Sequence, residues 1–111
     1  MRTLKFIVEG QIIKQDTNCD FSGLIPGTDG YLQAEFTFTT TDWHPLIKAV
    51  GFYSMMGREY DAQLLDENNR CMIPAEACEK QNFKLKVVGK GTNGFKLTTN
   101  KFTVSQNGGN T

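Results

Sequence analysis

Residues 60–104 read YDAQLLDENNRCMIPAEACEKQNFKLKVVGKGTNGFKLTTNKFTV, and this stretch decides the fold of the chain. Short runs of alternating apolar and polar residues, typical of half-buried strands, are separated by polar and glycine-rich turns. Pro74 has no N–H to donate to a ladder, so it ends a short strand over 70–73. Good helix formers follow, and we expect one helical turn near 74–80. The pattern then predicts further strands over 83–89, 95–98 and 100–105.

The same alternation continues toward the N-terminus of the chain. It predicts strands over 2–8, 11–14, 31–38, 47–54 and 58–65. Residues 15–30 are rich in turn formers and predict a long surface loop. About seven to eight short strands with one helical turn are typical of an all-β fold. We therefore predict an antiparallel Ig-like β-sandwich, with a small barrel as the alternative.

The length of 111 residues suits one domain with one core. We assign residues 1–105 to a single β-sandwich domain and residues 106–111, QNGGNT, to a frayed C-terminal tail. The inward positions of the predicted strands give the expected core, which consists of Phe6, Leu32, Ala34, Phe36, Phe38, Val50, Phe52, Leu85, Val87, Phe102 and Val104.

The charge of the chain is balanced but unevenly distributed. The 12 basic and 12 acidic residues give a formal net charge of zero, so nucleic acid is not expected as a partner. All the acids precede residue 81, whereas the C-terminal part contains Lys84, Lys86, Lys90, Lys96 and Lys101. These lysines indicate either a solvated strand face or a basic docking face for an acidic neighbour.

The sequence contains no pattern that predicts catalysis, a cofactor or a metal site, so we expect no enzyme. The single histidine, His44, lies far in sequence from the three cysteines, and no two cysteines have CxxC spacing. Three carboxylate pairs fall in predicted turns, where solvated acids are expected: Asp16/Asp20, Asp66/Glu67 and Glu76/Glu79. We expect Cys19, Cys71 and Cys78 to be reduced thiols, with a Cys71–Cys78 disulfide as the alternative.

The N-terminal run MRTLKFIVEG is too short for the apolar region of a signal sequence. No stretch approaches the ~20 apolar residues of a membrane span. We therefore expect synthesis in the cytosol without a visible export signal, and no membrane span.

Aromatic side chains supply further candidates for an interaction site, because Trp and Tyr are favoured anchors of interfaces. Trp43 lies in a predicted loop, where it covers one end of the sandwich, contacts a partner protein, or forms part of an aromatic platform for a ligand such as a sugar. The full set of interaction candidates consists of Trp43, Tyr31, Tyr53, Tyr60, Lys84 and Lys86.

Three segments of the chain, TDWHPLIKAVGFYS, YDAQLLDENNRCMIPAEAC and FKLKVVGKGTNGFKLTTNKFTV, resemble a family of small phage tail proteins. These are β-sandwich domains of the baseplate and tail-fibre region in phages and prophages of Gram-positive bacteria. The residues that carry the resemblance are Asp42-Trp43, Ala49-Val50-Gly51-Phe52, Cys71-Met72-Ile73-Pro74-Ala75-Glu76, and Gly89 with Thr99-Asn100.

The resemblance implies a non-enzymatic structural protein of the virion, made in the host cytoplasm. Such a protein would assemble with other tail or baseplate proteins, or present a receptor-binding partner. It would also form a homo-oligomer, a trimer or hexamer before a dimer. Two alternatives stay open: a small carbohydrate- or surface-binding module, and a β-sandwich adaptor of non-phage origin.

Overall fold

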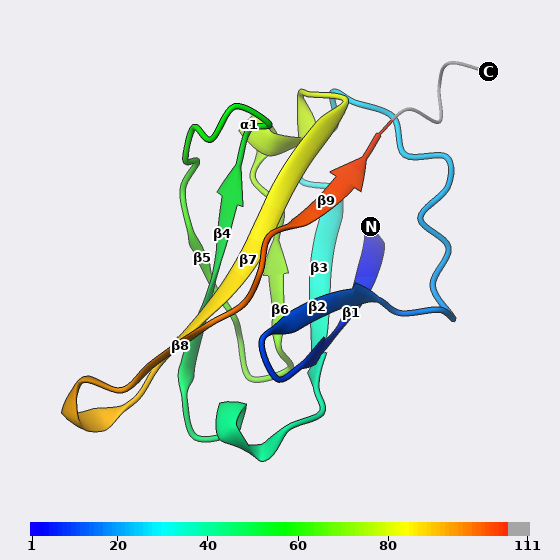
Figure 1. The fold of residues 1–111 in the computed structure, drawn as a ribbon. Coiled ribbons are helices and arrows are strands. Elements are labelled where there is room, and N and C mark those ends of the chain that lie inside the picture. The colour runs from blue at the N-terminus through cyan, green and yellow to red at the C-terminus, as the bar shows by residue number, and fades with distance from the viewer. Residues whose placement is uncertain (107–111) are drawn as a thin grey trace.

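Two β-sheets enclose one hydrophobic core in the computed structural model, which describes residues 1–106 (Figure 1). The prediction of an all-β protein with two packed sheets is confirmed. Within the described residues there are nine strands, against the seven to eight predicted in total, and each overlaps one of the stretches where the alternation predicts a strand.

The first sheet, sheet A, has the strand order β2-β1-β3-β6. Its strands are β1 (Arg2–Glu9), β2 (Ile12–Gln15), β3 (Leu32–Phe38) and β6 (Arg70–Met72). The pairing of β1 with β3 is parallel, which corrects the prediction of a wholly antiparallel sheet. Parallel pairing requires a long connection, and the chain supplies one through β2 and the loop that follows it.

The second sheet, sheet B, has the order β5-β4-β7-β8, and β9 also pairs with β7. Its strands are β4 (Ile47–Tyr53), β5 (Gln63–Leu64), β7 (Asn82–Lys90), β8 (Lys96–Thr98) and β9 (Phe102–Ser105). Every pairing in this sheet is antiparallel. The long strand β7 lies at its centre, with β4 on one side and β8 and β9 sharing the other.

The predicted strand over 58–65 is largely wrong. Only β5 and a single bridge between Tyr53 and Glu59 pair with the sheet in this region. The segment runs at the edge of sheet B, where no second neighbour holds it to the ladder. Its alternating pattern reflects instead the inward packing of Tyr60 and Leu65 against the core.

The predicted core is confirmed, with one difference. Phe102 is partly exposed and packs against the core, whereas the other ten predicted residues are buried. Phe6 and Phe36 stack across the parallel pair with ring centroids 5.1 Å apart. Phe21 from the long loop meets Phe6 edge-on at 5.3 Å, which holds part of that loop on the domain.

Trp43 closes one end of the sandwich. It ends a short 3-10 helix, η1 (Thr41–Trp43), and its side chain is completely buried. The indole N–H donates to the carbonyl of Gly10 at 2.7 Å, and the ring lies 5.2 Å from that of Phe38. The burial of Trp43 therefore connects sheet A with the loop that leads into sheet B.

The opposite end is closed by the short helix α1 (Ala75–Cys78) and by Gln106. The helix confirms the helical turn predicted after Pro74. Gln106 was predicted to begin the tail, but it is completely buried, and its amide donates to the carbonyls of Cys78 and Lys80. Gln106 is therefore part of the packed domain, and the remainder of the predicted tail, 107–111, lies outside the described residues.

Hydrogen bonds join the two sheets along one side. Asn100 lies between β8 and β9. Its side-chain oxygen accepts the backbone N–H of Ile13 in β2 at 2.9 Å, and its backbone N–H donates to the Gln11 carbonyl. The Gln11 side chain donates to the Thr98 carbonyl at 3.0 Å. The free edge of β2, on the side away from β1, is therefore covered by the end of the other sheet. A second short 3-10 helix, η2 (Thr92–Gly94), forms the tip of the hairpin between β7 and β8 (Figure 1).

Candidate functional site

The outer face of sheet B collects all five lysines of the C-terminal part of the chain. On β7 the side chains alternate, so Phe83, Leu85 and Val87 are buried while the lysines between and beside them point outward. The pairing register places Lys96 of β8 beside Lys90, and Thr103 of β9 beside Lys84. We call this surface the lysine face; it consists of Ile47, Ala49, Tyr53, Leu64, Lys84, Lys86, Val88, Lys90, Lys96 and Lys101.

Exposed aliphatic side chains lie beside these lysines on the same face. Ile47 of β4 is 72% exposed and Leu64 of β5 is 70% exposed. Ala49 lies between Leu64 and Val88 in the register of the three strands. An exposed apolar stripe bordered by charged residues is typical of a protein interface rather than of an ordinary solvated face.

Tyr53 lies flat on the lysine face rather than in the core. Its hydroxyl reaches over Gly51, where a Cβ atom would be only 2.7 Å away. The ammonium groups of Lys101 and Lys86 lie 4.1 Å and 5.6 Å from the centre of its ring. These contacts leave Tyr53 only 7% exposed, so it orients the two lysines rather than projecting toward solvent.

The structure therefore brings together three of the six predicted interaction residues, namely Tyr53, Lys84 and Lys86. Trp43 offers no surface because it is completely buried, so its position favours the covering role over contact with a partner. Tyr60 lies beyond the end of β4, where Arg58 stacks over its ring at 6.0 Å. Tyr31 lies just before β3, in sheet A.

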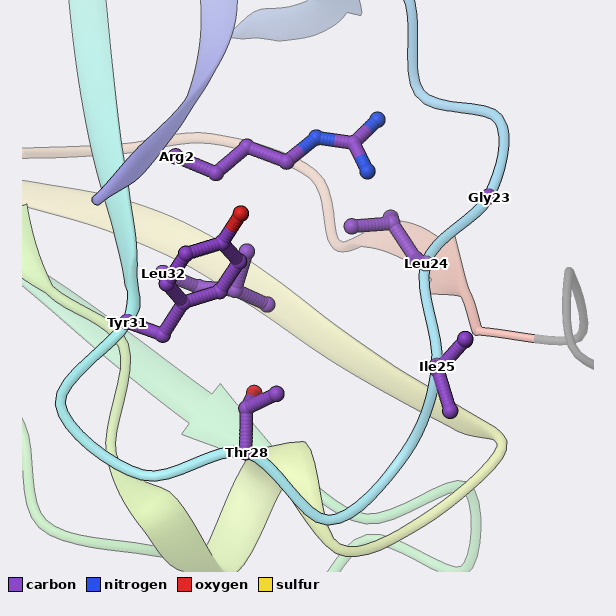
Figure 2. Close-up of a pocket in the computed structure, with 7 residues that line it drawn as sticks. All are labelled: Arg2, Gly23, Leu24, Ile25, Thr28, Tyr31 and Leu32. Carbon is purple, nitrogen blue, oxygen red and sulfur yellow. The ribbon is translucent and has the colours of Figure 1, made fainter.

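Tyr31 lines a small pocket between the start of sheet A and the long loop (Figure 2). The pocket has a volume of about 220 Å³, and Arg2, Leu24 and Thr28 contribute to its walls. The Arg2 guanidinium donates to the carbonyls of Asp20 and Ser22, at 2.9 Å and 2.6 Å, so it holds the loop in place. The volume lies below the ~300 Å³ at which pockets for small molecules usually begin.

Two of the three carboxylate pairs contain an acid that builds a turn. Asp16 accepts the N–H of Asn18, and Asp20 accepts that of Ser22. The hydrogen bond from Ser22 lowers the pKa of the Asp20 carboxyl. Asp66 accepts two backbone N–H groups in the turn between β5 and β6, those of Asn68 and Arg70. Aspartate side chains commonly accept such hydrogen bonds from the backbone in turns.

The environments of the cysteine thiols and of His44 are typical of side chains with a structural role. All three cysteines are free, and Cys71 and Cys78 are buried. Burial, with a smaller contribution from the Asp66 charge, raises the pKa of Cys71 to about 12, which makes it a poor nucleophile. His44 lies 3.4 Å from the Phe38 carbonyl. Within residues 1–106, no three metal-ligating side chains gather at one place.

Sequence reasoning missed the apolar part of the lysine face and two exposed methionines. Residues 47–54 were predicted as a strand, but no exposed position was assigned to Ile47. No sequence pattern indicates this exposure, because it depends on the pairing of β4 with β7, which are distant in sequence. Met55 and Met56 follow β4 and are 48% and 98% exposed.

Comparison with known proteins gives no relative for this chain, since no family model, no curated protein and no solved structure matches it. Among the described residues, no helix is long and apolar enough to cross a membrane.

Proposed function

We propose that the protein is a non-enzymatic assembly module that contacts its neighbours through the lysine face. The single observation that carries the proposal is the gathering of five lysines beside exposed Ile47 and Leu64 on one side of one sheet. Among the described residues, one acidic side chain adjoins this face: Glu59, which pairs with Tyr53 in an isolated bridge at the edge of the sheet. A neighbour would therefore bury the aliphatic side chains and present carboxylates to the lysines around them.

A second copy of the chain is the neighbour that the charge distribution favours. Taking the five lysines from the 12 basic residues leaves seven basic residues against 12 acidic ones on the rest of the chain. One copy can thus present an acidic surface to the lysine face of the next. Contact between two different surfaces of the same molecule is heterologous, and it produces rings when the rotation closes.

The biological setting that we propose is a phage tail or baseplate, in the virion. Support for it comes from the sequence resemblance of the Trp43 segment, the turn at Pro74 and the final strand pairs. A trimer or hexamer is expected before a dimer for the same reason. We further propose an Ig-like arrangement of the two sheets, supported by their packing around one core, with the parallel β1–β3 pair as the main departure.

A saccharide-binding module is the alternative function, favoured by one observation. Tyr31 is 47% exposed and stands with Arg2 in the pocket of Figure 2, where an aromatic face and a guanidinium could receive a small sugar. Titration with monosaccharides, followed by Tyr31 chemical shifts in NMR spectra, separates the two functions. A saturable response that is also seen at the Thr28 and Leu32 amides, and that disappears from those two amides in Tyr31→Ala, would favour this alternative.

Light scattering over a range of salt concentrations tests the assembly proposal. We expect a mass above that of one chain at low salt and a decrease toward the monomer at high salt, because the contact is between opposite charges. The double variant Lys84→Glu/Lys86→Glu should be monomeric at both salt concentrations.

The matched control is Lys5→Glu/Lys14→Glu, which makes the same change in charge on exposed lysines of sheet A. It also removes the ion pair of Lys14 with Glu9, a fully exposed contact that adds little to stability. The control should assemble like the unchanged protein. A protein that is monomeric at every salt concentration, or a control that dissociates equally, would overturn the proposal.

A further inference from the structure

An apolar groove lies between the segment after β4 and the start of β7. These two segments lie at the end of sheet B where α1 is found (Figure 1). One wall is the segment after β4, with Ser54, Met55, Met56, Arg58 and Tyr60. The other wall is the turn before β7, with Lys80 and Gln81, and the first residue of β7, Asn82. The groove has a volume of about 480 Å³, within the range of sites that bind ligands.

The methionines make this groove unusual for a solvated loop. Met56 is 98% exposed, and Met55 is 48% exposed, so neither contributes to the core. Exposed thioether side chains are flexible and polarizable, and they adapt to apolar ligands of different shape. Tyr60 adds an aromatic ring, which is partly buried against the core and therefore rigid.

Each wall of the groove carries one positively charged side chain. Arg58 stacks over Tyr60 at 6.0 Å on one side, and Lys80 is exposed on the other. None of the residues that line the groove is acidic. The occupant that fits these surroundings is apolar and carries a carboxylate.

We propose that the groove binds a peptide segment of a partner protein in which an apolar side chain adjoins a carboxylate. Met55, Met56 and Tyr60 would contact the apolar side chain, and Arg58 and Lys80 would receive the carboxylate. Ser54, Gln81 and Asn82 supply hydroxyl and amide groups along the groove, which suit the hydrogen bonds of a peptide backbone. A fatty acid would present no such groups along its chain, which favours a peptide.

Methionine methyl resonances provide the test, because the chain has only four methionines. Protein with labelled methionine methyl groups is titrated with the blocked tetrapeptide ELFE and with its charge-reversed counterpart KLFK. We expect saturable shifts of Met55 and Met56 with ELFE, and affinity at least about ten-fold weaker for KLFK. Met72 belongs to β6 in sheet A, so its signal is the internal control and should stay in place.

Three variants complete the experiment. Met56→Ala removes an exposed side chain, so it should weaken binding without unfolding the protein. Arg58→Gln should reduce the preference for ELFE over KLFK, because only Lys80 then remains to receive the carboxylate, whereas Lys5→Gln on sheet A should leave it unchanged. Octanoate is added separately, and tighter binding of octanoate than of ELFE would assign the groove to a lipid. Either that result, or methyl signals that do not move with ELFE at millimolar concentration, would overturn the proposal.

Discussion

At Gly89 the absence of a side chain lets the end of the sandwich close. A Cβ atom at this position would lie 2.7 Å from Leu46 Cδ1 and 2.9 Å from Trp43 Cζ3. Both neighbours are buried, and Trp43 is also held by its hydrogen bond to Gly10. Trp43 cannot move away without opening its contact with Phe38. Gly89 is therefore required by packing rather than by backbone conformation.

The substitution Gly89→Ala should lower the free energy of unfolding by about 1–3 kcal/mol, the usual cost of overpacking a core. Gly51→Ala is the matched control in the neighbouring strand, where the Cβ atom would meet the Tyr53 hydroxyl at 2.7 Å. The Tyr53 ring lies on the outer face and can swing into solvent, so this change should cost less. Urea unfolding measures both values, and equal costs would show that Trp43 adjusts freely.

Among the elements, the strands with one buried face were the most predictable. β3 and β7 alternate strictly between buried and outward side chains, and both were predicted within one residue of their observed starts. That pattern does not reveal the direction of a neighbouring strand, so the parallel β1–β3 pair was not foreseen. The pattern also does not distinguish pairing from packing, which explains the error over 58–65.

The candidate site was predictable in its charge but not in its shape. The five C-terminal lysines were evident from the sequence, and the β-strand period already placed Lys84 and Lys86 on one face. The lysines lie beside Ile47 and Leu64 only because β4 pairs with β7 and with β5, and these strands are distant in sequence. The methionine groove likewise depends on two turns that only tertiary packing brings together.

The element-scale prediction concerns Asn100, whose side chain joins β2 to the end of sheet B. Asn100→Ala should leave the part-buried Ile13 N–H without its acceptor, at a cost of about 1–3 kcal/mol. Hydrogen exchange at the Ile13 amide should accelerate in proportion. Asn18→Ala is the control, because Asn18 is exposed and contributes only its backbone N–H to Asp16. Unchanged exchange at Ile13 would show that the two sheets are not joined through this residue.

At the scale of the whole molecule, both sheets share one core. A single cluster of buried residues extends from Leu4 in β1 to Val104 in β9. Trp43 lies against Phe38 of sheet A and against Gly89 of sheet B, so its environment depends on both sheets at once. The fold should therefore unfold as one unit, as small single domains usually do.

We predict that Trp43 fluorescence and far-ultraviolet circular dichroism report one coincident urea transition. The midpoint should be unchanged by a reductant, because the three cysteines are free, and by a chelator. The indole is completely buried, so its emission should shift to longer wavelength only when the sheets separate. Fluorescence that changes before the dichroism would show that the Trp43 end opens independently of the sheets. A midpoint that falls with reductant would reveal a disulfide, and one that falls with chelator would reveal a metal that stabilises the native state.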